Sequence, residues 1–174
     1  MNLVGENRVQ EFLLKKDSLI NSADRHFIGH LQTNKAEKAV EYFDYIHSVD
    51  SLKLAEVISQ VACRLNKREK VLLQVNLSGE EQKFGYDKAT LRAEFLKIFG
   101  LKNLEVVGLM CMAPFGAKET ELKTLFGSLR EFRDELENCF NVKLPELSMG
   151  MSDDYEIAVT EGATMIRIGR KLFS

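Results

Sequence analysis

VLLQVNL, residues 71–77, is apolar at nearly every position, and LEVVGLM, residues 104–110, repeats this character. Runs of this length are too short for a typical helix. Hydrophobicity on both faces is typical of strands that lie buried in a parallel sheet. The two runs therefore predict an α/β fold.

Short apolar runs recur along the chain, with helical segments between them. The other five candidate strands cover residues 2–4, 26–29, 45–48, 146–149 and 164–168. Two helical segments carry apolar stripes, at positions 52, 55, 58, 62 and 65 and at positions 122, 125, 129, 132, 136 and 139. Ser51 and Asp87 precede helical segments as N-caps, and Asn34 with Glu37 resembles a capping box. This alternation predicts parallel strands joined by right-handed crossovers.

The number of strands bears on whether the sheet closes. Seven strands and six helices fall one βα unit short of the eight that close a (β/α)8 barrel. We therefore predict a single domain over residues 1–174, an incomplete TIM barrel that lacks its first strand and helix. An open doubly wound sheet fits the same count. A missing strand would leave two unpaired edges, so we also expect self-association.

Charge and composition exclude several partners. Lys and Arg number 24 against 26 Asp and Glu, and the net charge of -2 provides no basic surface for nucleic acid or an anionic membrane. The longest nearly apolar run, VVGLMCMAPF, is too short to span a bilayer, and no signal-peptide pattern opens the chain, so we expect a cytoplasmic protein. Cys63, Cys111 and Cys139 form no zinc pattern and are expected to be buried thiols.

The segment LSMGMSDD, residues 147–154, predicts a phosphate cradle. Gly150 allows the backbone to approach a ligand, and Ser152 offers a hydroxyl where a helix, expected from about Asp153, exposes unsatisfied N–H groups. The alternative is that Ser152 serves only as the helix N-cap. A second glycine turn, at Gly169 in MIRIGR, follows the next strand. Loops after the last two strands of a (β/α)8 barrel are a recurrent phosphate site.

Arg167 lies between two isoleucines inside an apolar strand. Because the guanidinium charge cannot be removed, the side chain must be paired or must face a polar site. An ion pair with Glu6 or Asp153 is the alternative to a ligand site. Arg170 is either a second phosphate donor or a solvated side chain.

No sequence pattern predicts a metal site. His26, His30 and His47 lie near two neighbouring strand ends but lack metal-ligand spacing, so we expect them to be satisfied polar side chains. No GxSxG, P-loop or GxGxxG motif occurs, so the common hydrolase, NTPase and dinucleotide-binding signatures are absent.

Six segments, in this order, resemble the YggS/PROSC family of pyridoxal 5′-phosphate (PLP) homeostasis proteins: GENRVQE, HFIGHLQTNK, IHSVDS, GLMCMAP, LSMGMSDDYEIAV and ATMIRIGR. The resemblance implies a barrel of the alanine racemase N-terminal type. It also implies a phosphate site between Gly150, Met151 and Ser152 on one side and Gly169 and Arg170 on the other. Arg167 would face the pyridine nitrogen. The remaining implied cavity residues are Asn7, His47 and Met110.

Family members hold PLP as a Schiff base on a lysine upstream of the GEN motif. No residue of this chain matches that position, and the nearest lysines, Lys35 and Lys83, do not inherit it. We therefore expect the Schiff-base lysine to be absent and the chain to be N-terminally truncated relative to the family.

The resemblance implies a PLP-binding protein of intracellular PLP homeostasis, a reservoir or carrier without catalytic residues, with PLP-dependent apoenzymes as possible partners. A permanently cationic arginine at the ring nitrogen disfavours its protonation and so suits a carrier. Two alternatives stay open. One is a racemase-like PLP enzyme, which is disfavoured because no second domain supplies the racemase's tyrosine. The other is a phosphate-ligand-binding barrel that has lost covalent PLP attachment.

Overall fold

The structure is a computed structural model that describes residues 3–16, 23–79, 84–169 and 171. Seven strands form one sheet in the order β1 to β7, and every neighbouring pair is parallel. The strands are β1 (Leu3–Glu6), β2 (Asp24–Phe27), β3 (Tyr45–Val49), β4 (Glu69–Gln74), β5 (Leu104–Met110), β6 (Glu146–Met151) and β7 (Met165–Arg167). This parallel sheet of seven strands confirms the predicted arrangement.

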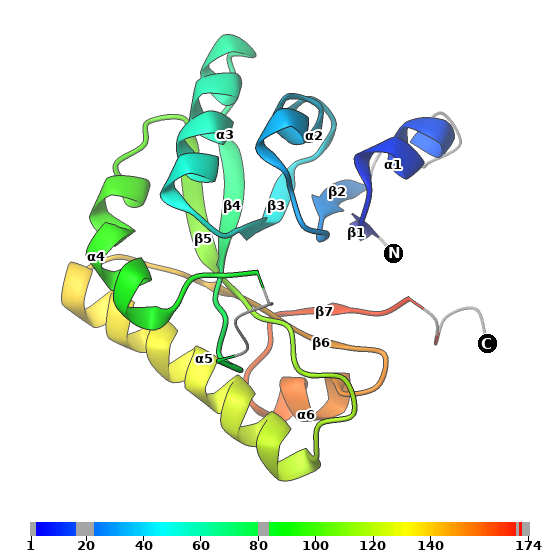
Figure 1. Ribbon diagram of the computed structural model, residues 1–174, viewed down its shortest axis with the longest axis vertical. Helices are drawn as coiled ribbons and strands as arrows, with labels where there is room; N and C mark the ends of the chain where they lie inside the picture. Colours follow the sequence, from blue (N-terminus) through cyan, green and yellow to red (C-terminus); the bar gives the residue numbers. More distant parts are fainter. Residues whose placement is uncertain (1–2, 17–22, 80–83, 170, 172–174) are drawn as a thin grey trace.

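A helix connects each strand to the next, and the helices lie around the outside of the strands (Figure 1). They are α1 (Val9–Lys15), α2 (Ala36–Tyr42), α3 (Leu52–Arg64), α4 (Lys88–Phe99), α5 (Glu119–Phe140) and α6 (Tyr155–Thr160). A 3₁₀ turn at Thr33–Lys35 precedes α2. Across the described ranges, none of the helices combines the length and apolar character needed to cross a membrane.

The sheet curves into a nearly closed barrel whose two end strands are β1 and β7 (Figure 1). In the part of the chain that the structure describes, no backbone pairing joins these two strands. Both carry an exposed apolar side chain, Leu3 at 49% and Ile166 at 41% of its full exposure. The end strands therefore present open edges beside apolar surface.

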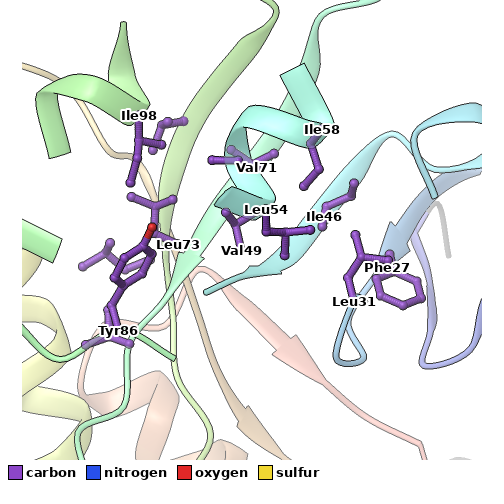
Figure 2. Close-up of a cluster of buried hydrophobic side chains, with 14 of the residues drawn as sticks. Phe27, Leu31, Ile46, Val49, Leu54, Ile58, Val71, Leu73, Tyr86 and Ile98 are labelled. Atoms are coloured by element: carbon purple, nitrogen blue, oxygen red, sulfur yellow. The ribbon is translucent and has the colours of Figure 1, made fainter. Parts of the chain in front are cut away.

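The main core lies between the strands and the helices. Figure 2 shows Leu54 and Ile58 of α3 pointing toward Ile46 and Val71 of the sheet; all four are fully buried or nearly so. Burial of each such side chain contributes roughly 1.5–3 kcal/mol to folding. A second, smaller cluster, formed by Leu72, Val107 and Met110 with Tyr45 packed against it, lies on the opposite face of the strands, inside the barrel.

Two of the predicted helix starts, those at Ser51 and Asp87, are confirmed. Ser51 Oγ accepts a hydrogen bond from Leu54 N–H at 3.3 Å, and Asp87 Oδ1 accepts one from Thr90 N–H at 2.9 Å. The predicted capping box of Asn34 and Glu37 is wrong. The 3₁₀ turn occupies that position, so α2 begins at Ala36 and its N-cap residue makes no side-chain capping bond.

The cysteines differ in exposure. Cys111 is fully buried, as predicted, but Cys63 and Cys139 are exposed, so the prediction for these two is wrong. Each lies in the last turn of its helix, α3 or α5, with its side chain exposed.

Candidate functional site

The carboxyl ends of parallel strands meet at one end of a barrel, and most of the predicted site residues lie there. Met110 is the last residue of β5, Met151 the last of β6 and Arg167 the last of β7, while Asn7 directly follows β1. His47 lies deeper, in the middle of β3. The fold thus brings residues from distant parts of the sequence to one end of the sheet.

Gly150 marks the place where β6 turns toward α6. Its φ of +89° is strained for any residue with a side chain, and a Cβ added there would lie 2.5 Å from Ala158 Cβ. Beyond it, Asp154 Oδ1 accepts a hydrogen bond from Met151 N–H at 2.5 Å. Helix α6 begins at Tyr155, two residues later than predicted, and its N-cap residue is Asp154 rather than Ser152.

The turns after β6 and β7 touch each other. Ser152 Oγ accepts a hydrogen bond from Gly169 N–H at 3.3 Å. A Cβ added at Gly169 would meet no atom of the described residues within 4 Å, so this part of the structure leaves open space in front of the glycine. The two glycine-bearing turns therefore form one small polar surface beside open space, in the positions where a phosphate was predicted.

Arg167 is held by uncharged partners. Its Nη1 donates to Ser148 Oγ at 2.6 Å, and its Nη2 donates to the carbonyl oxygen of Cys111 at 2.9 Å. Within residues 3–16, 23–79, 84–169 and 171, no acidic side chain forms an ion pair with it, and Glu6 pairs with Lys15 instead. Burial lowers the pKa of Arg167, but a guanidinium stays charged at neutral pH. The remaining N–H groups of this cation can serve an acceptor on a ligand.

Two buried histidines extend the hydrogen-bonded contact between Arg167 and Ser148. His47 Nδ1 lies 2.9 Å from Ser148 Oγ, and His47 Nε2 lies 2.8 Å from His26 Nδ1. The His26 ring stacks on Tyr45, with centroids 4.2 Å apart. Burial lowers the pKa of His26 and holds that of His47 well below its ordinary value, and the neighbouring charges of His26 and Arg167 lower the latter further. Both histidines are therefore neutral at physiological pH.

The third histidine lies apart from this pair. His30 Nδ1 is 3.4 Å from Asp50 Oδ2, and its ring stacks on Phe84 with centroids 3.5 Å apart. It lines a separate pocket of about 470 Å³ with Asp50 and Ser51. Over the described ranges, no group of three His, Cys, Asp or Glu side chains is placed to hold a metal ion.

Comparison with known proteins assigns the chain to a family. The model of the alanine racemase N-terminal domain matches residues 2–174. The pyridoxal phosphate homeostasis protein of Aquifex aeolicus is 44% identical over 174 residues, which are 99% of this chain and 76% of that protein. The protein of the same name from Synechocystis is 44% identical over 170 residues, 97% of this chain and 78% of the other. The chain belongs to the pyridoxal phosphate homeostasis protein family.

Solved structures of this family share the fold. PipY of Synechococcus elongatus, determined with PLP bound, is 46% identical and superimposes with a TM-score of 0.92 over 98% of this chain and 80% of PipY. Alanine racemase of Clostridium difficile is only 15% identical, with a TM-score of 0.81 over 97% of this chain and 44% of the racemase, and so shows the fold alone. The predicted barrel of alanine racemase N-terminal type is confirmed.

The remaining predicted cavity residues of this homeostasis-family chain lie in different surroundings. Met110 is fully buried in the cluster inside the barrel. Asn7 is exposed, and its carbonyl oxygen lies so close to Gly29 that an added Cβ there would be 2.0 Å away. Met151 is 41% exposed and follows Gly150 at the rim. Met151 and Met110 lie beside Arg167 and Ser148 as neighbours in the strand pairing. His47 joins the network around Arg167 through a side-chain hydrogen bond.

Some predicted residues of this family member have no described structure. Arg170 and Lys83 lie outside the described residues. Lys35 ends the 3₁₀ turn before α2 and is partly buried.

The structure adds to the site three residues that the sequence analysis did not assign to it. Ser148 and Cys111 supply the partners of Arg167, and His26 supplies the partner of His47. For Ser148 a signal existed, because it lies two residues before Gly150 in a strand and so shares its face. The contact between His26 and His47 depends on the register of two strands, and no motif in the sequence encodes it.

Proposed function

We propose that this chain binds PLP at the carboxyl end of the barrel and serves as a carrier or reservoir in PLP homeostasis. The phosphate would lie against Gly150, Met151, Ser152 and Gly169, with Arg170 as a further donor. Arg167 would face the ring nitrogen, and Asn7, His47 and Met110 would border the cavity. Family membership and the PLP bound to PipY support this assignment.

The observation that carries the proposal is that the direct hydrogen-bond partners of Arg167 are uncharged. An arginine whose charge is balanced by a carboxylate would be a structural ion pair, whereas among the described residues this cation donates to a hydroxyl and a carbonyl. The carboxylate of Asp154 acts on it electrostatically without an ion-pair contact. A ring nitrogen is an acceptor that such a cation can serve. PLP supplies an aldehyde and an electron-withdrawing ring, and Arg167 opposes protonation of that ring and weakens its electron withdrawal. This favours storage and delivery of the cofactor over catalysis.

Titration with PLP, followed by absorbance and by equilibrium dialysis, tests this function. We expect saturable binding of one PLP per chain and affinities weaker by about tenfold or more for Arg167→Gln and Ser152→Ala. The matched control is Arg64→Gln, because Arg64 is exposed on α3 and its charge lies 3.8 Å from Glu37 in a surface pair. A chain that does not bind PLP, or an Arg167→Gln variant that binds like the parent, contradicts the proposal.

Competition separates PLP recognition from a general phosphate site. We expect inorganic phosphate to displace PLP only at concentrations far above that of PLP, because the ring contacts are lost. Equal competition would favour the phosphate-ligand-binding barrel. Borohydride reduction after incubation with PLP, followed by peptide mapping, reports on the attachment, and we expect no stoichiometric adduct on a single lysine.

A further inference from the structure

A continuous chain of hydrogen bonds crosses the inside of the barrel. It runs from the carbonyl oxygen of Cys111 through Arg167, Ser148 and His47 to His26, with successive separations of 2.9, 2.6, 2.9 and 2.8 Å. Its members come from β2, β3, β6 and β7 and from the end of β5. Apart from the partly buried Arg167, every side chain in it is buried.

The direction of these bonds follows from the chemistry of arginine. A guanidinium can only donate, so Ser148 Oγ accepts from Arg167. When the serine hydroxyl donates to His47 Nδ1, that nitrogen carries no proton, so Nε2 of neutral His47 carries one and donates to His26 Nδ1. His26 then carries its proton on Nε2. This buried atom has no protein partner among the described residues.

If the hydrogen bonds ran in the opposite direction, fewer polar groups would have a hydrogen-bond partner. If His26 donated to His47 and His47 donated to Ser148, the serine proton would have no acceptor among the described contacts, and His26 Nε2 would be an unfilled acceptor as well. Each buried polar group without a partner costs roughly 1–3 kcal/mol. The first direction leaves only the His26 N–H unsatisfied, so Arg167 sets the tautomer of both histidines.

Burial keeps the histidine pair neutral among the charges around it. His26 is influenced by the carboxylates of Asp24, Asp44 and Glu146 and by the ammonium of Lys70, while His47 faces Arg167. Tyr45, which stacks on His26, also accepts a hydrogen bond from Lys70 at 3.1 Å. For His26, burial outweighs the carboxylates. For His47, burial and the cation act in the same direction.

We propose that His47 and Ser148 are positioning residues that hold the Arg167 guanidinium toward its ligand through a hydrogen-bonded chain of fixed direction, ended by the Nε2–H tautomer of His26. A neutral partner orients the guanidinium without cancelling its charge, as a carboxylate would, and without the repulsion of a second cation. The identity of the ligand, a ring nitrogen of PLP, rests on the proposed function. The tautomers and the direction of the chain do not.

Nitrogen-15 NMR of the imidazole side chains tests the direction of the chain in the protein without ligand. We expect His26 and His47 to carry the proton on Nε2 and none on Nδ1 at pH 8. His30, which is exposed, serves as the reference, and His26→Gln and His47→Gln assign the signals. We also expect Ser148→Ala to release the tautomer of His47. A proton on Nδ1 of either buried histidine, or an imidazolium at neutral pH, overturns the proposal.

Ligand binding tests the positioning role. We expect His47→Leu and Ser148→Ala to weaken PLP binding by about tenfold while changing the affinity for inorganic phosphate by less than about twofold. His47→Gln should recover part of the loss, because an amide can accept from Ser148 and donate to His26. Unchanged PLP affinity in His47→Leu, or an equal loss for PLP and phosphate, overturns the positioning role. If the parent chain binds no PLP, the proposed function fails, and the NMR result alone decides the direction of the chain.

Discussion

Lys67 Nζ lies 2.7 Å from Glu69 Oε2, and this carboxylate is completely buried at the first residue of β4. The lysine also donates to the carbonyl oxygens of Val40 and Phe43, so it ties β4 to the end of α2. Burial raises the pKa of Glu69 to about 7, because the loss of hydration outweighs the attraction of Lys67. An ionisable core group is therefore poised to titrate near neutrality.

The free energy of unfolding should fall with rising pH through the titration of Glu69. The folded chain binds this proton more tightly than the unfolded chain, whose glutamate titrates near pH 4.5. The contribution of Glu69 to the free energy of unfolding is therefore largest below its unfolded pKa, and it declines until the pH passes about 7. Between pH 5 and pH 8 this group should remove about 2–3 kcal/mol. Urea unfolding at both pH values measures the difference.

The matched variants are Glu69→Gln and Glu119→Gln, the latter removing an exposed carboxylate that pairs with Lys123 at 2.6 Å. We expect Glu69→Gln to flatten the pH dependence and Glu119→Gln to leave it unchanged. Parallel pH profiles for the parent chain and Glu69→Gln would contradict this assignment.

Gly150→Ala should destabilise the fold and abolish PLP binding. The substitution combines a left-handed backbone with a Cβ placed 2.5 Å from Ala158 Cβ, so α6 must move away from β6. Gly116→Ala is the control, because φ is +73° there but an added Cβ meets no atom within 4 Å. Backbone strain costs roughly 1–2 kcal/mol in either variant. Because Gly150→Ala adds the close contact with Ala158, we expect its loss of stability in thermal unfolding to exceed that of Gly116→Ala by at least about 1–2 kcal/mol. Equal losses would show that the contact with Ala158 carries no energy.

The three thiols should react in two classes. Cys63 and Cys139 are exposed, whereas Cys111 is buried and burial raises its pKa to about 12. A thiol reagent at pH 8 should therefore modify Cys63 and Cys139 quickly in the folded chain and modify Cys111 only in denaturant. Peptide mapping after brief labelling identifies the sites. Rapid labelling of Cys111 without denaturant would contradict its placement beneath the site.

Self-association should depend on the two end strands. β1 and β7 each have one neighbour in the described sheet, and Leu3 and Ile166 expose apolar surface there. We expect sedimentation to show oligomers of the parent chain, and Leu3→Lys with Ile166→Lys to shift the population toward monomer. Leu14→Lys is the control, because Leu14 is 89% exposed on α1 and belongs to neither end strand. A parent chain that sediments as a monomer would contradict this prediction.

The sequence predicted those parts of the fold that depend on local chemistry. The near-continuous apolar runs became β4 and β5, and the helix caps at Ser51 and Asp87 formed as expected, because such caps need only residues within one turn. The capping box at Asn34 failed because a 3₁₀ turn over Thr33–Lys35 precedes α2, so the helix begins at the buried Ala36.

The site was predictable only in outline. Gly150 and Gly169 could be found from their places after two strands, and the structure brings their turns together. The partners of Arg167 could not be chosen, since the ion pair with Glu6 or Asp153 and the contact with Ser148 are equally compatible with the sequence. The register between β6 and β7 decides the outcome, and a single-residue slip would turn Ser148 to the other face.

The contact between His47 and Ser148 joins positions 101 residues apart, and Arg167 lies a further 19 residues along the chain. Contacts of this length form late in folding, because the intervening chain must first be ordered. During synthesis, β3 leaves the ribosome long before the strand that carries Arg167. A ligand held by this arginine therefore cannot guide the early strands into place. Such a ligand stabilises only the finished barrel, so a molecule that carries the ligand is one that has completed its folding.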